Sequence, residues 1–155
     1  MYRWVVFLHM AATFGFLLAH GVQAAVMLKF RVEADPERSL MLFNVLPSLR
    51  LLRLLTVLIV ITGLIAGFMV NWWRQGWLWA SLALLIVIAV LMARYGSGYF
   101  GMIAGSAGRA VEAGKRGPDM DAFNAARAAW HPIGMTVVGL VGLAVILWLM
   151  MFKPF

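Results

Sequence analysis

Four long apolar stretches constrain this chain more than any other feature of its sequence. They cover about residues 2–28, 49–70, 77–93 and 133–152. An apolar run of about 18 residues or more is long enough for an α-helix to cross the hydrocarbon core of a bilayer. The first stretch is too long for a secretory signal, and no small-residue cleavage site follows it in the right place, so we interpret it as a retained helix. The sequence predicts an all-α integral membrane protein with four spans.

The composition indicates the same class of protein. Of the 155 residues, 64% are hydrophobic and 12% are charged, which is more apolar surface than a soluble domain of this length can bury. The length suits one four-span membrane domain, residues 1–155, without a separate soluble domain. The chain has no cysteine, which excludes disulfides, thiolate metal sites, iron–sulfur clusters and haem attached through a C-x-x-C-H motif.

The cations are concentrated in the two long connections between the spans, about residues 29–48 and 94–131. Ten of the 13 lysines and arginines lie in these connections or at their flanks. Since Lys and Arg are enriched in cytoplasmic loops, we expect both connections on the cytoplasmic side and both termini on the outer side. Six of the seven tryptophans lie near the expected outer boundary, in agreement with the interfacial preference of Trp. Together these features predict an antiparallel four-helix bundle.

The net charge of +7 suits anionic lipid headgroups at the cytoplasmic face and disfavours nucleic acid as a partner. Arg50 and Arg53 share one face of the first turn of the second span, and their long stems can reach the headgroups. A specific lipid or phosphate site is the alternative for this pair. In the second connection, we expect Asp119 to be the N-cap of a helix through residues 120–130.

Small residues recur at helical spacing in three of the spans. In lipid, such residues allow helix backbones to approach closely and to gain van der Waals contacts. These faces are expected to pack helices within one chain or between subunits, so a homo-oligomer and a partner membrane protein both stay open. The residues are Ala11, Gly15 and Ala19 in the first span, Gly63 and Gly67 in the second, and Gly139 and Gly142 in the fourth.

Two of the three histidines lie inside the first apolar stretch. A helix turns by about 100° per residue, so His9 and His20 point within about 20° of the same direction, about 16 Å apart along the axis. Thr13 and Gln23 flank them on the same side of the helix, which gathers the polar side chains into one stripe. Polar groups in hydrocarbon are costly and face the interior of a bundle. We therefore expect this polar stripe to be the buried face of the first span.

The specific interpretation of the stripe is a b-type haem. A neutral imidazole nitrogen is an axial ligand of haem iron, and a four-helix bundle supplies a dry pocket. With three histidines, at most one haem with two histidine ligands fits. His20 and His131 both approach the cytoplasmic half of their spans, so we expect them to be the ligand pair, with His9 in second place. Met135 is an alternative second ligand.

Other interpretations of the same residues stay open. Imidazole and thioether groups also suit copper, although His9 and His20 lie too far apart to share one ion. A proton path or a hydrogen bond to a quinone would use the stripe as well. In the plainest interpretation, its side chains form interhelical hydrogen bonds of about 0.6 kcal/mol each that fix the register of the bundle. Hydrolysis is disfavoured because no carboxylate lies in a span, and the absence of a GxxxxGK[ST] loop excludes a primary transporter.

The segment "LHMAATFGFLLAHGVQAAV", the polar "EADPERS" turn and three further spans resemble the bacterial four-helix membrane proteins of a domain of unknown function (the DUF2269 type). That group is itself similar to the copper-resistance D membrane domain. The matching residues are His9, His20 and Gly21. The copper-resistance domain implies metal handling, and the wider group of small histidine-bearing membrane subunits implies haem. The lack of a Met- or His-rich tract on the outer side disfavours copper import.

From these features we expect a multi-pass protein of the bacterial cytoplasmic (inner) membrane that uses one haem b for electron transfer or sensing. The alternative is a non-catalytic accessory or assembly subunit of a larger membrane complex. In that case the small-residue faces would be the working surfaces.

Overall fold

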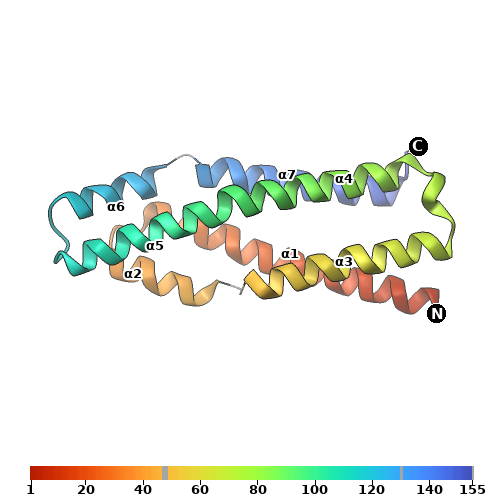
Figure 1. Ribbon diagram of the computed structural model, residues 1–155, viewed down its shortest axis with the longest axis horizontal. Helices are drawn as coiled ribbons and strands as arrows, with labels where there is room; N and C mark the ends of the chain where they lie inside the picture. Colours follow the sequence, from red (N-terminus) through yellow and green to blue (C-terminus); the bar gives the residue numbers. More distant parts are fainter. Residues whose placement is uncertain (47–48, 130, 155) are drawn as a thin grey trace. The chain divides into compact units, whose positions relative to one another are not determined.

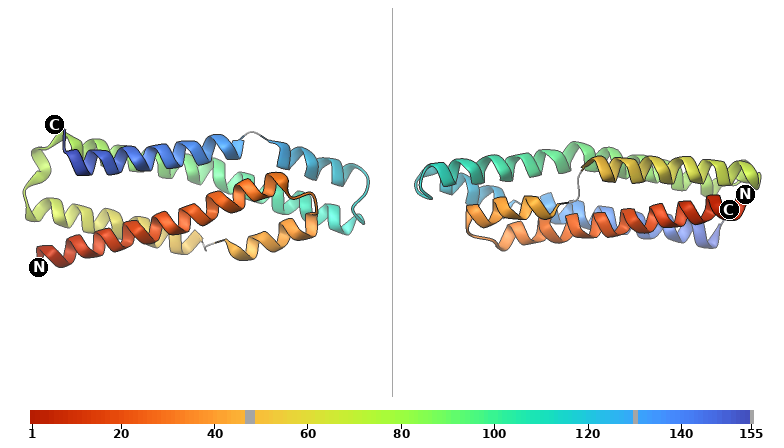
Figure 2. Two further views of the ribbon diagram at one scale, coloured as in Figure 1. Left: turned by 180° about the vertical axis from the view of Figure 1, so that it is seen from behind. Right: turned by 90° about the horizontal axis from the view of Figure 1, so that it is seen from below.

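The computed structural model describes residues 1–46, 49–129 and 131–154, and the side chains of residues 49, 97, 131 and 132 lie outside that description. The described part of the chain is helical throughout, with short connections (Figures 1 and 2). The helices are α1 (Tyr2–Val32), α2 (Pro36–Leu42), α3 (Leu49–Met69), α4 (Gly76–Leu91), α5 (Ser97–Glu112), α6 (Pro118–Ala128) and α7 (His131–Phe152). Single 3₁₀ turns follow α2 (Phe43–Val45) and precede α4 (Trp72–Arg74), and a π-helical turn (Met92–Gly96) joins α4 to α5.

Four helical stretches are long and apolar enough to cross a membrane. They are Tyr2–Val32, Pro36–Met69, Gly76–Glu112 and Pro118–Phe152. This confirms the all-helical class and the number of candidate spans. The helices also extend beyond the apolar stretches, because α1 continues to Val32 and helices α2, α5 and α6 occupy the expected connections.

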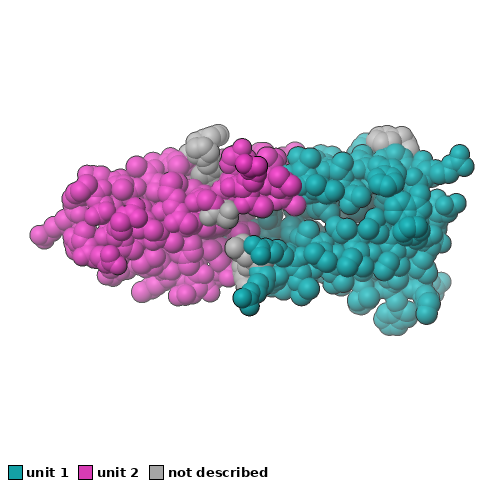
Figure 3. Space-filling model, viewed as in Figure 1, with its two compact units in different colours: residues 1–22, 47–87, 142–155 teal, residues 23–46, 88–141 magenta. Residues whose placement is uncertain are grey.

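The chain divides into two compact units (Figure 3). Unit 1 contains residues 1–22, 47–87 and 142–155, and unit 2 contains residues 23–46 and 88–141. All six acidic residues of the chain belong to unit 2.

Unit 1 is made of the apolar parts of α1, α3, α4 and α7. The two chain ends and the turn at Trp72–Arg74 lie at the same end of this unit (Figures 1 and 2). There the ammonium group of Lys153 lies 4.1 Å from the ring centroid of Trp72, a cation–π distance. Large side chains such as Trp4 and Phe14 are exposed on the outside of the unit. Such an apolar exterior suits lipid and would be costly in water.

Unit 2 has a core of the kind found in water-soluble proteins. Helix α5 packs against α2 and α6, and its small residues let Phe123 of α6 become fully buried against Ala107 and Ala110. A second cluster surrounds Phe30 and Ile103, which are also fully buried. The segments expected as connections therefore contribute the most deeply buried aromatic side chains among the described residues.

The helix ends in unit 2 follow ordinary capping rules, with one correction to the sequence analysis. The N-cap of α6 is Gly117, with φ +70°, and Pro118 takes the first helical position, where its missing N–H is not needed. The expectation that Asp119 caps this helix is therefore wrong, and Asp119 instead lies in the first turn, where its charge suits the helix dipole. Asp35 caps α2, because its carboxylate accepts a hydrogen bond from the backbone N–H of Glu37.

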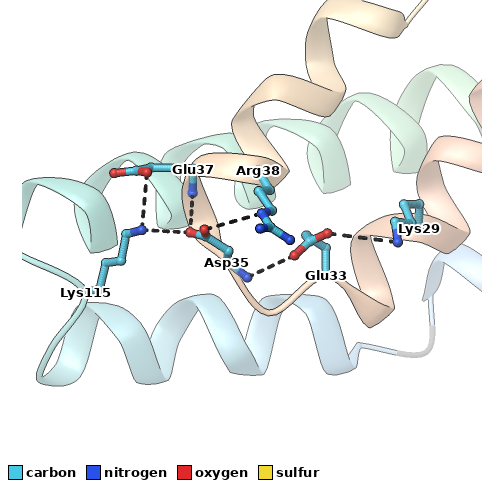
Figure 4. A network of polar contacts seen from close by, with 6 residues as sticks. All are labelled: Lys29, Glu33, Asp35, Glu37, Arg38 and Lys115. Atoms are coloured by element: carbon cyan, nitrogen blue, oxygen red, sulfur yellow. Dashed lines mark hydrogen bonds and ion pairs between the residues drawn. The ribbon is translucent and has the colours of Figure 1, made fainter.

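Ion pairs connect α2 to the turn between α5 and α6 (Figure 4). The Nζ of Lys115 lies 2.9 Å from a carboxylate oxygen of Asp35 and 3.3 Å from one of Glu37. The hydrogen bond from Lys115 lowers the pKa of Asp35, and the same bond raises the pKa of Lys115. Arg38 and Asp35 form a longer pair at 3.9 Å. These groups are solvent-accessible, so each pair contributes little to stability by itself.

Candidate functional site

The polar stripe of α1 is half-buried along its length. His9, Thr13, His20 and Gln23 are all partly covered, whereas Met10, Phe14, Leu18 and Val22 on other sides of the helix are exposed. His9, Thr13 and His20 belong to unit 1, and Gln23 belongs to unit 2. The imidazoles of α1 are thus turned away from its most exposed face.

His9 is held by helix α3 through one of its two ring nitrogens. Its Nδ1 lies 3.0 Å from the carbonyl oxygen of Ile59 and 3.1 Å from the Oγ1 of Thr62. The Thr62 hydroxyl donates a hydrogen bond to the carbonyl oxygen of Leu58, with 2.6 Å between the two oxygens. A carbonyl oxygen only accepts hydrogen bonds, so the proton of the neutral ring is on Nδ1. The Nε2 atom of His9 then carries a free lone pair.

A glycine on the neighbouring helix leaves space for this position of the ring. A Cβ at Gly63 would lie 3.2 Å from the Cε1 of His9, which is closer than nearly all real contacts of this kind. The absence of a side chain at Gly63 therefore allows the imidazole to lie against α3. Two other glycines serve ordinary packing in unit 1: a Cβ at Gly15 would meet Leu55 at 3.5 Å, and one at Gly67 would meet Leu78 at 3.5 Å.

A cavity of about 80 Å³ lies beside His9 in unit 1 and is partly open at the surface. Parts of α1, α3, α4 and α7 line it, together with the turn before α4. Its wall is almost entirely apolar. The aromatic, polar and sulfur-containing side chains that line the cavity include His9, Phe16, Trp73, Trp79, Ser81 and Met150.

Two of the side chains that line this cavity carry a polar atom without a hydrogen-bond partner. The Oγ of Ser81 and the Nε1 of Trp73 are both buried and unpaired, and Ser81 is only 2% exposed. By contrast, the Nε1 of Trp79 donates to the carbonyl of Trp73, at 2.9 Å. A buried polar group without a partner costs about 1–3 kcal/mol, so a bound molecule that pairs with Ser81 and Trp73 would recover that free energy.

Ser81 and Trp73 are not among the site residues expected from the sequence. Trp73 is one of the tryptophans expected at the membrane interface. That explanation gives no reason to expect its indole N–H to lack a partner. Ser81 carries a usable signal, since it is a single hydroxyl in the otherwise apolar run "WASLALLIV". A polar side chain in such a run faces the protein interior in membrane helices.

His20 lies in a different environment from His9. Its ring stacks on Phe16 with centroids 5.7 Å apart and an interplanar angle of 6°. Its Nε2 is buried without a hydrogen-bond partner. His20 is therefore a second candidate ligand on the stripe, although it is not among the residues that line the cavity beside His9.

The other predicted ligands belong to unit 2. Met135 lies close to Gly96, where an added Cβ would be 3.3 Å from the methionine methyl group. The side chain of His131 lies outside the described part of the chain. The pairing of His20 with His131 or with Met135 stays a prediction. Within the described residues, no group of three or more His, Asp or Glu side chains is placed to hold a metal ion.

The remaining predicted positions divide by burial. Ala19, Gly67, Gly139 and Gly142 are buried, and Ala11 is exposed. Arg50 and Arg53 are both exposed on the first turns of α3. Their roles in subunit packing and in headgroup binding stay predictions.

No family model matches this sequence, and no curated protein and no solved structure matches it either.

Proposed function

We propose that this chain is a four-span protein of the bacterial inner membrane, with its spans in an antiparallel bundle and both termini outside. Three observations support this arrangement. Four helical stretches have the length and hydropathy of spans, the two chain ends lie at one end of unit 1 (Figure 1), and all the acidic residues belong to unit 2. The cationic side would face the cytoplasm and its anionic lipids.

Within this arrangement, the function that the geometry supports best is ligand binding through His9. The observation that carries this proposal is the hydrogen bond from Nδ1 of His9 to the carbonyl of Ile59. It fixes the tautomer and leaves the Nε2 lone pair for a partner, in a ring that borders an apolar cavity. A small membrane-soluble molecule held there would take part in electron or proton transfer within the membrane.

Haem b is the second candidate ligand. Histidines that bind metal usually donate their other ring N–H to a carbonyl or carboxylate, as His9 does, and Met150 on the same cavity offers a thioether as a second ligand. The size of the cavity disfavours this candidate. At about 80 Å³ it admits only the edge of one ring, since a cavity of roughly 150 Å³ is needed to hold a whole benzene. A porphyrin would require several side chains to move.

The test is the identity of whatever copurifies with the protein. The full chain is purified in a mild detergent, its visible spectrum is recorded, and an organic-solvent extract is analysed by mass spectrometry. We expect a lipid-soluble ring compound at near-stoichiometric amount, whereas a Soret band would identify haem.

Two variants locate the binding group. In His9→Asn, the amide nitrogen replaces Nδ1 and still donates to Ile59, but nothing replaces Nε2, so the amount of copurified ligand should fall while the fold stays intact. His20→Ala is the matched control and should retain ligand. A wild-type protein that carries neither compound, or ligand loss in His20→Ala but not in His9→Asn, would contradict the proposal. In the first case, the accessory-subunit alternative would become the better account.

A further inference from the structure

Three side chains that line the His9 cavity carry polar groups with a definite hydrogen-bonding pattern. The Nε2 of His9 offers a lone pair and only accepts, as shown by the bond at Nδ1. The indole Nε1 of Trp73 only donates, and the hydroxyl of Ser81 donates or accepts; both lack a partner. All three side chains line the same cavity.

A ligand that satisfies this set must both donate and accept. A carbonyl oxygen accepts from Ser81 and Trp73, but it leaves the lone pair of His9 unpaired. A hydroxyl group on a ring does both, since its O–H donates to His9 and its oxygen accepts from Ser81 and Trp73. A purely apolar ligand pairs with none of these atoms.

The cavity also restricts the size and shape of the ligand. Its volume of about 80 Å³ admits the hydroxylated edge of one ring rather than a fused macrocycle. The cavity is partly open, so the rest of the ring and an attached chain can remain outside it. The apolar wall and the apolar exterior of unit 1 suit a molecule that partitions into lipid.

Resting on the proposed function, we infer that the ligand is a single-ring quinol with a lipid-soluble tail. We further infer that the site binds the reduced quinol more tightly than the oxidised quinone. The two forms share the ring and the tail, and they differ in the hydrogen that only the quinol can donate to His9. One hydrogen bond contributes about 0.5–1.5 kcal/mol, so the quinol should bind about 2–12-fold more tightly.

The experiment measures both redox forms of one probe on the full chain. Decylubiquinol and decylubiquinone are titrated against the protein in lipid nanodiscs by equilibrium dialysis, and empty nanodiscs correct for partitioning into lipid. The wild type should prefer the quinol by about 2–12-fold.

Two variants separate the roles of the wall residues. In His9→Asn, quinol and quinone should bind equally, because the acceptor at Nε2 is gone. In Ser81→Ala, both forms should bind about 2–12-fold more weakly while the preference for quinol persists. Ser106→Ala is the matched control. Its hydroxyl is also buried, but it already donates to the carbonyl of Ile103 in unit 2, so the affinities should not change.

Equal affinity of the wild type for both forms, a preference for the quinone, or no binding of either form would overturn this inference. An unchanged affinity in Ser81→Ala would overturn it as well. These failures are distinct from a failure of the proposed function, which the copurified ligand and its loss in His9→Asn decide independently.

Discussion

The two units of this chain differ in which apolar side chains they bury and which they expose. In unit 2, Phe30, Ile103 and Phe123 are fully buried, and the charged groups around them form ion pairs at the surface. In unit 1, Trp4 and Phe14 are exposed, at 72% and 64%, and no acidic residue is present in its sequence. Fully buried large side chains and surface ion pairs therefore distinguish unit 2, whereas unit 1 combines exposed aromatic side chains with the absence of acidic residues from its sequence.

The comparison also shows where a functional site is expected. Both units bury hydroxyl groups without partners, namely Ser39 and Tyr99 in unit 2 and Ser81 in unit 1. Ser81 differs because it shares a cavity with His9 and Trp73. A buried polar group without a partner lowers the stability of the fold. It indicates a binding site only where a cavity beside it gives room for a ligand.

The largest expected effect is on the core of unit 2. Phe123→Ala removes a side chain that is fully buried and should lower the free energy of unfolding by about 3–5 kcal/mol. Phe14→Ala, at an exposed position of unit 1, should change it by about 0.5 kcal/mol or less. Unfolding by sodium dodecyl sulfate, followed by circular dichroism in mixed micelles, measures both. Equal losses in the two variants would remove the distinction between the units.

A smaller effect is expected at the glycine beside His9. Gly63→Ala brings a methyl group to 3.2 Å from the imidazole, so the ring must move and its hydrogen bonds to α3 weaken. Gly21→Ala is the control, since a Cβ there meets nothing within 4 Å. We expect Gly63→Ala to be less stable than Gly21→Ala by about 1 kcal/mol, the value of one hydrogen bond. If both variants gain stability equally from helix propensity, the imidazole is not packed against Gly63.

The smallest effect is expected from the ion pairs of unit 2 and depends on pH. The pKa of Asp35 is lowered below 3.8 by Lys115, so the stability it adds is complete above that value and is lost as the pH falls through the lower pKa of the folded state. The pKa of Lys115 is raised above 10.5, so its contribution is complete below that value and is lost as the pH rises through the raised pKa.

Asp35→Asn tests this dependence, because Asn still caps α2 but cannot pair with Lys115 as an anion. Its unfolding midpoint should vary less with pH below 3.8 than that of the wild type. Identical acid profiles for the wild type and Asp35→Asn would show that the Lys115 pair does not contribute.

Much of the fold could be predicted from hydropathy, because an apolar run of about 20 residues has few alternatives to a spanning helix. The expected span 49–70 corresponds to α3, and the expected span 133–152 lies within α7. The core of unit 2 was not predicted. Phe30 and Phe123 lie among charged residues, and their burial depends on contacts with distant segments such as Ala107 and Ala110 of α5.

The candidate site could be predicted only in part. The periodicity of α1 identified His9 and Thr13 as one polar stripe. It could not reveal the carbonyl of Ile59, because a backbone acceptor is present at every position and leaves no signal in the sequence. Ranking His20 above His9 rested on depth along the helix, whereas the tautomer of His9 is determined by a partner on another helix.

The most direct test of this account is the protonation of the His9 ring. Nitrogen-15 NMR of the full chain with labelled histidine, in detergent and without added ligand, separates the two ring nitrogens, and the signals lost in His9→Asn belong to His9. We expect a proton on Nδ1 and none on Nε2. A proton on Nε2 would place a donor where the proposed site needs a lone pair, and the proposed site would then be wrong.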